Sequence, residues 1–243
     1  MTGVGRPFAA FDIDGTLIRW QLYHAIVDAL IRLNYVSAED FEAIKQARMD
    51  WKRRTAEASF KSYEGELIRA YEATLVSISP AQLDTAVEAV FGEYKDQVYV
   101  YTRNLIEELK KKGYLLFAIS GSQSEIVAKV AEYYGFDAFV GTDYEQIDNK
   151  FTGKKDFHAH NKDVVLKKLV KEFKATSAGS FAVGDSMGDV AMLELVENPI
   201  AFNPESALFA AAKKNAWKVV LERKNVIYEL EADGSSYILA KTV

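Results

Sequence analysis

The chain changes its hydrophobic pattern at about residue 99, and this change most constrains its fold. After that point short apolar runs alternate with stretches of helical spacing, which is typical of strands and helices in βαβ units. The run Tyr114–Ile119 is continuously apolar, as expected for a parallel strand covered on both faces. Residues 20–98 instead show helical spacing and no convincing strand. The sequence therefore predicts an α/β core with a helical insertion.

The predicted strands of the core follow one another at short spacing. After the first strand at 8–11, they cover residues 114–119, 138–141, 181–184, 200–202 and 218–221. Predicted helices lie between them, at 104–112, 125–134, 162–173, 190–196 and 205–214. Because the first strand must join this sheet, we expect a doubly wound, mainly parallel sheet with an inserted all-helical cap domain. The predicted domains are the core at 1–18 and 99–243 and the cap at 19–98.

Turn chemistry marks the insertion and the tail. Ser37 and Ser79-Pro80 are expected helix starts within the insertion. The tail, with strands at 226–230 and 237–240 around Asp233-Gly234, predicts a C-terminal β-hairpin. Such a hairpin could pair with the edge of another subunit, but we expect it to fold onto its own sheet. The sequence leaves the oligomeric state open.

Composition narrows the class of protein. The chain has 243 residues, of which 49% are hydrophobic and 27% charged, which favours a folded globular protein over a disordered one. The net charge of -5 gives no general attraction to nucleic acid or anionic membranes. The chain has no cysteine, so disulfides and cysteine nucleophiles are excluded. The first residues form no apolar segment of signal-peptide length, and we expect a cytoplasmic protein.

Polar residues that could carry chemistry follow successive predicted strands. Asp12 and Asp14 follow the first strand and Ser120-Gly121 follows the second. Lys162 opens a helix, and a run from Gly184 to Asp189 contains two further acids, Asp185 and Asp189. Ligands of open α/β sheets bind at the carboxyl ends of the strands. These residues are therefore predicted to meet at one site.

Each of these features also has an ordinary structural interpretation. Asp-x-Asp-Gly is often a surface turn, Ser-Gly-Ser a helix cap, and a single lysine a solvated side chain. A His-x-His pair at 158–160 lacks further ligands nearby, which argues against a zinc site. Taken together, the acids, a hydroxyl-glycine turn and a cation on successive strand ends are what Mg²⁺-assisted phosphoryl transfer needs.

With these residues the chain resembles the haloacid dehalogenase (HAD) superfamily, in the branch that includes phosphoserine phosphatases. The matching motifs are Asp12–Leu17, Ser120-Gly121, Lys162 and Gly184–Asp189. The helical insertion after the first motif lies at the cap position of that branch. The resemblance covers about residues 7–221.

The resemblance implies a role for each matching residue. Asp12 would be the nucleophile that forms an aspartyl-phosphate, and Asp14 the acid and base that exchanges protons with the leaving group and water. Ser120 and the Gly121 amide would hold the phosphoryl group, and Lys162 would offset its charge. The Mg²⁺ ligands would be Asp12, Asp185 and the backbone carbonyl of Asp14. Asp189 would act on the metal indirectly, through water or through Lys162.

Departures from the pattern concern the substrate. The resemblance implies a substrate-binding glutamate where this chain has Gln21, and a cap arginine near Ala70, beside Arg69. Gly188 stands where those enzymes have asparagine. Phosphoserine is therefore a doubtful substrate, and pocket candidates are Trp20, Gln21, Tyr23 and Arg69.

The predicted function is hydrolysis of a small phosphorylated metabolite by a Mg²⁺-dependent phosphatase, with no nucleic-acid or membrane partner. Two alternatives remain open. The same chemistry could transfer the phosphoryl group to an acceptor alcohol, or the fold could only bind a phosphorylated ligand. The intact set of Asp12, Asp14, Lys162 and Asp185 argues against a binding module, which needs no nucleophile and acid together.

Overall fold

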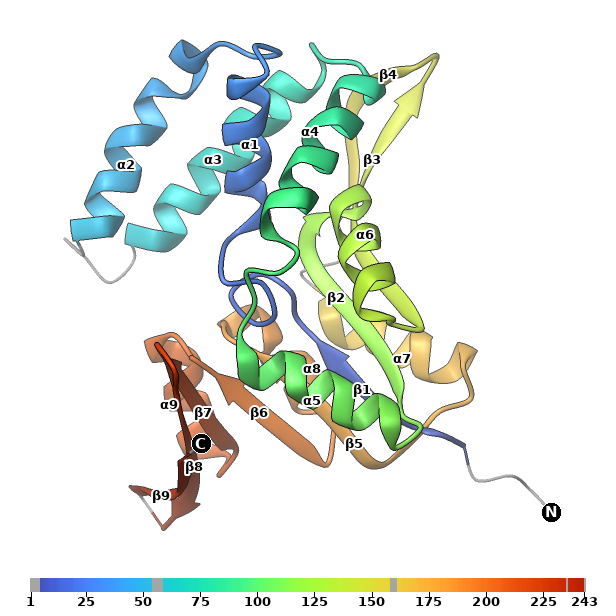
Figure 1. Cartoon of the computed structure of the whole chain (residues 1–243), viewed down its shortest axis with the longest axis vertical. Coiled ribbons are helices and arrows are strands. Elements are labelled where there is room, and N and C mark those ends of the chain that lie inside the picture. The colour runs from blue at the N-terminus through green and yellow to red at the C-terminus, as the bar shows by residue number, and fades with distance from the viewer. Residues whose placement is uncertain (1–4, 54–58, 158–160, 235, 243) are drawn as a thin grey trace. The chain divides into compact units, whose positions relative to one another are not determined.

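The computed structural model divides into two compact units (Figure 1). It describes residues 5–53, 59–157, 161–234 and 236–242. The core unit comprises Met1–Trp20, Tyr94–Thr142 and Phe157–Val243. The inserted unit comprises Gln21–Glu93 and Asp143–Asp156. Across the part of the chain that is described, no helix is both long enough and apolar enough to cross a bilayer.

The described strands form one sheet in the order β4-β3-β2-β1-β5-β6-β7-β8-β9. Their bounds are β1 Pro7–Phe11, β2 Leu115–Gln123, β3 Ala138–Ile147, β4 Lys150–Phe157, β5 Thr176–Gly184, β6 Asn198–Phe202, β7 Lys218–Arg223, β8 Val226–Asp233 and β9 Ser236–Thr242. Pairing is parallel from β3 through β7, and antiparallel between β7 and β8 and between β8 and β9. The predicted α/β class and C-terminal hairpin are confirmed, and β8 pairs with its own sheet as expected.

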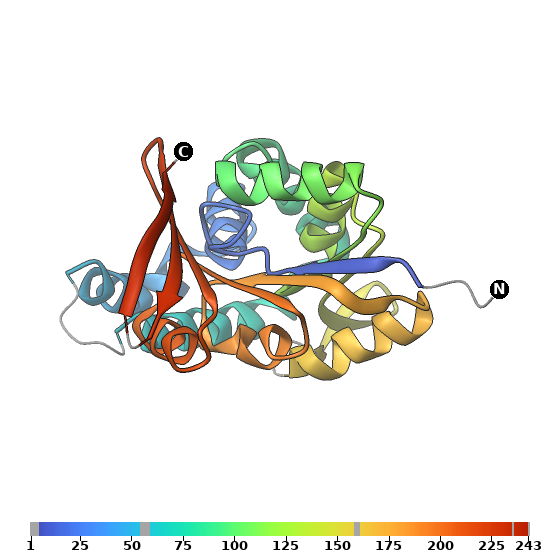
Figure 2. The same ribbon diagram turned by 90° about the horizontal axis from the view of Figure 1, so that it is seen from below.

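The central strands are apolar because both faces of the sheet are covered. In β1, Ala10 pairs with Phe117 of β2 on one side and with Ala182 of β5 on the other, and all three are fully buried. Figure 2 shows helices α5 and α6 on one face and α7, α8 and α9 on the other. These helices span α5 Val100–Lys111, α6 Ser124–Tyr134, α7 Lys162–Glu172, α8 Val190–Leu193 and α9 Ser206–Lys214. The core on the α7–α9 face includes Phe8, Phe117, Leu166, Met192 and Leu208.

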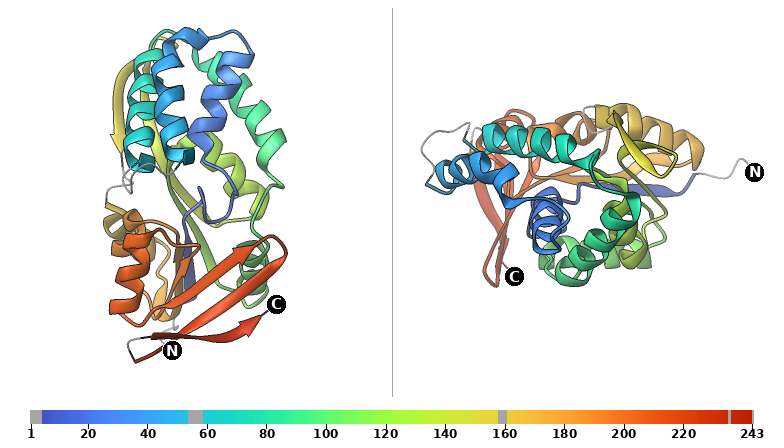
Figure 3. Two further views of the ribbon diagram at one scale, coloured as in Figure 1. Left: turned by 90° about the vertical axis from the view of Figure 1, so that its left-hand side faces the viewer. Right: turned by 90° about the horizontal axis from the view of Figure 1, so that it is seen from above.

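The described part of the inserted unit contains four α-helices, which Figure 3 shows beside one another. They are α1 Leu22–Arg32, α2 Glu42–Arg53, α3 Ser59–Leu75 and α4, which begins at Pro80 and ends at Tyr94. A short 3₁₀ turn, η1 Ala38–Phe41, precedes α2, and the Ser37 hydroxyl accepts a hydrogen bond from the Glu39 amide, 3.1 Å away. At α4 the Gln82 side chain accepts a hydrogen bond from the Ser79 amide at 2.8 Å. Both predicted helix starts therefore carry the expected caps.

The inserted unit also contains the outer part of a β-hairpin, residues 143–156 of β3 and β4. Only a short strand at 138–141 is predicted near this hairpin, and the predicted domain bounds include residues 143–156 in the core at 99–243. Asp148 and Asn149 form its turn with φ values of 50° and 60°, a left-handed pair that suits a two-residue hairpin connection. Most of its described side chains are exposed, so it lacks the buried face that would make it recognisable as a strand pair.

Candidate active site

The carboxyl ends of β1, β2 and β5 bring the predicted chemical residues together in the core unit. Asp12 directly follows β1, and Ser120 lies in the last part of β2. Asp185 directly follows β5, and Asp189 ends the short 3₁₀ turn η3, Met187–Asp189. Lys162 is the first residue of α7. The parallel order of these strands places their ends at the same edge of the sheet, which explains the convergence.

Lys162 is the charged centre of the site. Its Nζ lies 2.7 Å from Asp12 Oδ1 and 2.6 Å from Asp189 Oδ1, and it is only 5% exposed. The other oxygen of Asp12, Oδ2, accepts a hydrogen bond from the Thr16 hydroxyl at 3.0 Å. Both Asp12 oxygens are therefore held by buried donors, which fixes the orientation of this carboxylate.

Asp189 holds the β5 loop together. Its Oδ2 accepts hydrogen bonds from the Asp185 amide at 3.1 Å, and from the Ser186 amide and hydroxyl at 3.0 and 3.1 Å. Because Oδ1 binds Lys162, one side chain orients both the lysine and the loop that carries Asp185. This packing needs a glycine at 184, since a Cβ there would lie 2.3 Å from Asp189 Cγ.

Ser120 links the second strand to Asp14. The Ser120 hydroxyl donates to Asp14 Oδ2 at 2.7 Å, and the Ser120 oxygen accepts from the Ser122 amide at 3.0 Å. The carbonyl oxygen of Gly121 accepts a hydrogen bond from the buried Thr142 hydroxyl at 2.7 Å. The last part of β2 is therefore held in one conformation on both sides.

Three residues that the sequence analysis gave no role support this site. Thr16 binds Asp12 and Thr142 binds Gly121, as described above. Gly141 lets β3 approach the last part of β2, since a Cβ there would lie 2.8 Å from the Ser122 carbonyl oxygen. Thr16 lies within the first motif, Asp12–Leu17, so its position in the sequence could have indicated a role at the site. Gly141 and Thr142 matter only through packing between strands, which the sequence alone does not reveal.

The site holds more negative than positive charge. Burial raises the pKa of Asp12 to about 7; Lys162 opposes this rise, and Asp189 and Asp14 add to it. Burial and the Asp12 and Asp189 charges likewise raise the pKa of Asp185 well above its ordinary value. For Lys162, burial acts to lower the pKa, but the two carboxylates outweigh it and raise the pKa. One ammonium thus faces several carboxylates that cannot all ionise without further positive charge.

This excess of carboxylate suits a hard divalent cation. Oxygens of Asp12, Asp185 and Asp189 lie within 4.8 Å of one another. Mg²⁺ prefers oxygen ligands, and one or two protein carboxylates are sufficient because the ion retains water and substrate oxygens. Since Asp189 already binds Lys162 and three loop donors, Asp12 and Asp185 are the carboxylates better suited to contact the metal.

The predicted pocket residues lie in different environments. Trp20 is the last residue of the first core segment, and Gln21 immediately precedes α1; both are partly buried. Tyr23 contacts Tyr144 within the inserted unit, with their hydroxyl oxygens 3.0 Å apart. Arg69 is exposed on α3. Their role in substrate binding stays a prediction, and the His-x-His pair at 158–160 lies outside the described residues.

Comparison with known proteins establishes the family. A sequence model of haloacid dehalogenase-like hydrolases matches residues 9–194, which is most of the chain. This chain therefore belongs to the haloacid dehalogenase-like hydrolase family, and the resemblance found in its motifs is confirmed.

Individual relatives agree with this assignment. Phosphoserine phosphatase SerB1 of Mycobacterium tuberculosis is 26% identical over 215 residues, covering 87% of this chain and 69% of that protein. The histidinol-phosphatase of Neisseria meningitidis is 24% identical over 229 residues, covering 88% and 98%. A solved structure from Bordetella pertussis, of unknown function, has a TM-score of 0.71 at 23% identity, covering 89% and 98%. The last similarity shows that the fold is shared.

Proposed function

We propose that this chain is a Mg²⁺-dependent phosphatase that hydrolyses a small phosphomonoester through a covalent phosphoryl intermediate on Asp12. The observation that carries the proposal is the buried Lys162 ammonium bound to both Asp12 and Asp189, with Asp14 two residues from Asp12. A nucleophile, a neighbouring acid and a fixed cation are the groups that phosphoryl transfer requires. The relatives named as phosphatases support the same reaction class.

In the first step, one Asp12 carboxylate oxygen attacks phosphorus and the bond from phosphorus to the ester oxygen breaks. Protonated Asp14 gives its proton to that leaving oxygen. The hydroxyl of Ser120, the amide of Gly121 and the ammonium of Lys162 bind the phosphoryl oxygens. Lys162 is suited to this role because two carboxylates keep it charged in a buried position.

In the second step, water attacks the phosphorus atom while the Asp14 carboxylate takes the proton from that water. The bond between phosphorus and Asp12 breaks, which releases inorganic phosphate and restores both aspartates. The Ser120 hydroxyl donates to Asp14 Oδ2 at 2.7 Å in this structure. Because it has one proton, it would give up this bond when it holds a phosphoryl oxygen, which leaves Asp14 free to transfer protons. A Mg²⁺ ion held by Asp12, the Asp14 carbonyl and Asp185 would neutralise charge on the transferring group.

The substrate in this proposal is a small phosphomonoester, and the residue at one expected recognition position argues against phosphoserine. Gln21 carries no charge, so it cannot pair with a substrate ammonium as a glutamate would. Trp20, Tyr23 and Arg69 are the remaining candidates for contacts to the substrate. A panel of phosphoserine, histidinol phosphate, phosphocholine and nucleoside monophosphates would identify the preferred class. Gln21→Glu should raise kcat/KM for phosphoserine relative to the rest of the panel.

The reaction can be tested with Mg²⁺ and p-nitrophenyl phosphate. The wild type should release phosphate, and chelation of the metal should stop the release. Asp12→Asn should lower kcat by about 10⁴-fold or more, as expected for loss of a covalent nucleophile. Asp163→Asn is a matched control, since Asp163 pairs with Lys167 on the surface of α7. Turnover that survives in Asp12→Asn would refute the mechanism.

A further inference from the structure

The last strand, β9, forms one edge of the sheet and lies in the core unit. One side pairs with β8, and Ser236 to Leu239 do so in regular antiparallel register with Asp233 to Leu230. Within the described part of the chain, no strand pairs with the other side of β9. The backbone groups on that side are therefore available to another strand.

The two edges of this sheet differ in how they are protected. The β4 edge carries Lys150, Lys154 and Lys155, and charged side chains, lysine above all, discourage pairing with another sheet. In β9 the only charged residue is Lys241, and no proline interrupts the strand. Its middle residues Ile238 and Leu239 are 50% and 55% exposed. The β9 edge lacks the features that prevent pairing.

Exposed apolar side chains continue from β9 across one face of the neighbouring strands. Leu239 pairs with Leu230, so both lie on the same face. On that face Tyr228 pairs with Leu221, and each is 38% exposed. Phe209 of α9, 39% exposed, contacts the ring of Tyr237 at 5.6 Å. We call Phe209, Leu221, Tyr228 and Leu239 the hairpin patch; Ile238, next to Leu239 in the strand, lies on the opposite face.

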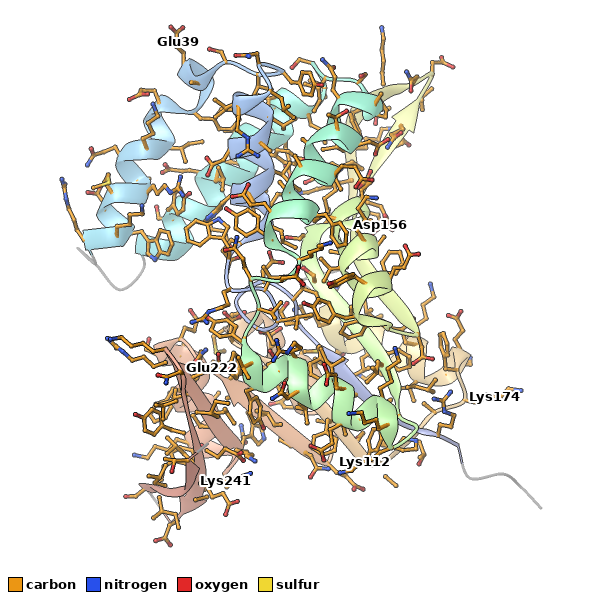
Figure 4. All side chains as sticks on the ribbon, viewed as in Figure 1. Glu39, Lys112, Asp156, Lys174, Glu222 and Lys241 are labelled. Atoms are coloured by element: carbon orange, nitrogen blue, oxygen red, sulfur yellow. The ribbon has the colours of Figure 1, made fainter. Side chains whose placement is uncertain are left out.

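Contacts on both faces of the sheet hold the β8–β9 hairpin against the rest of the core unit. Tyr237 donates a hydrogen bond from its hydroxyl to the Trp217 carbonyl oxygen at 2.8 Å. On the opposite face Glu229 of β8 pairs with Lys218 of β7 and lies 3.9 Å from Lys241 Nζ. Figure 4 marks Lys241 at this hairpin. A fixed edge strand loses little conformational entropy when it pairs, which favours association.

We infer that β9 pairs antiparallel with β9 of a second copy of this chain, so that the two sheets join across a two-fold axis. An axis near Ile238 or Leu239 places apolar residues of the two copies opposite each other. For an axis at Leu239, the two Lys241 residues stand four positions apart along the joined strands, about 14 Å at the usual rise. A second copy therefore fits this edge without placing like charges opposite each other.

The oligomeric state of the full chain tests this inference. Light scattering with size-exclusion chromatography should give the mass of a dimer for the wild type. Ile238→Lys with Leu239→Lys should weaken dimerisation by about 100-fold or more, because two apolar contacts per copy are replaced by charges. Val164→Lys is the matched control, since Val164 is an aliphatic residue 58% exposed on α7. A monomeric wild type, or a dimer unaffected by the double substitution, would overturn the inference.

A cysteine scan tests the register with milder substitutions. The chain has no cysteine, so a single cysteine can form a disulfide only with a second copy. Paired residues of antiparallel strands have Cα atoms about 4.5–5.5 Å apart, within disulfide range, whereas positions displaced from the axis separate by about 7 Å per residue. Oxidation should cross-link the variant nearest the axis, at Ile238 or Leu239, and leave Ser236→Cys and Val164→Cys without an intermolecular disulfide. Equal cross-linking of all four variants would contradict β9 pairing.

Discussion

Burial shifts the pKa values of titratable groups in opposite directions in the two units of this protein. In the core unit, burial raises the pKa of Asp12 to about 7, and neighbouring carboxylates add to the effect of burial. In the inserted unit, burial lowers the pKa of His24 to about 3, and the positive charge of Arg48 acts in the same direction. Burial favours the neutral form in both cases. The difference lies in what surrounds each group.

His24 is enclosed by aromatic rings, whereas Asp12 is enclosed by charge. The His24 ring lies 4.8 Å from the ring of Tyr63 and 6.2 Å from that of Trp51. The inserted unit therefore keeps this histidine neutral. Asp12 instead contacts Lys162, which also binds Asp189. The core unit thus retains electrostatic repulsion between buried carboxylates at the proposed catalytic site.

The largest effect is expected from removing the single cation of the cluster. Lys162→Met leaves buried carboxylates without their partner and should lower the free energy of unfolding by about 3–5 kcal/mol. Chemical denaturation monitored by circular dichroism would measure this loss. Lys167→Met is the control on the same helix, because Lys167 forms only an exposed ion pair with Asp163, which contributes little to stability. Equal stability of the two variants would show that the buried carboxylates do not depend on Lys162 for their stability.

The next largest effect is expected from Asp12, in the pH dependence of the free energy of unfolding of the metal-free protein. Its pKa is 3.8 in the ordinary state and about 7 when folded, so the folded protein binds more protons between these values. The contribution of Asp12 to the free energy of unfolding should therefore be fully present below the lower value and be lost as pH rises through the higher one. Asp12→Asn should reduce this fall. Saturating Mg²⁺ should do so as well, because it favours ionised carboxylates. A wild type and variant with parallel pH profiles would contradict this assignment.

His24 should change the free energy of unfolding with pH in the opposite direction to Asp12. Its pKa is 6.5 ordinarily and about 3 when folded, so the unfolded chain binds the additional proton in this range. Acidification from pH 6.5 to about pH 5 should cost the inserted unit about 2 kcal/mol. His24→Gln should remove this acid-side loss, with the fluorescence of nearby Trp51 as the readout. If the two proteins lose stability equally on acidification, His24 is not the group that titrates.

The smallest effect is expected at a buried carboxylate that has its own donors. Glu222, labelled in Figure 4, accepts hydrogen bonds from the amides of Val100 and Tyr101 at 3.1 and 2.9 Å, at the start of α5. Glu222→Gln keeps one acceptor oxygen and should cost about 1 kcal/mol, the usual value of a helix cap. Denaturation at neutral pH would measure it. If Glu222→Gln lowered the free energy of unfolding as much as Lys162→Met, a buried carboxylate with its own hydrogen-bond donors would be no different from the mutually repelling carboxylates of the active site.

The sequence predicted the parts of this molecule that local pattern determines. The central strands were predictable because burial on both faces requires continuous apolar runs, as in Leu115 to Ile119. The charged residues of the site were predictable because they stand at strand ends. The β3–β4 hairpin was missed because its outer half has little buried surface. The supporting roles of Gly141, Thr142 and Gly184 depend on contacts between distant segments, which no local pattern records.

The central claim is that Asp12 carries the phosphoryl group, and rapid quenching followed by mass spectrometry tests it most directly. With p-nitrophenyl phosphate the leaving group needs little help from an acid, so Asp14→Asn should still form the intermediate but hydrolyse it slowly. We expect a phosphoryl group to accumulate in this variant on the peptide that contains Asp12, and to be absent when Asp12→Asn is added. A phosphoryl group on any other residue, or steady turnover with none on Asp12, would contradict the account.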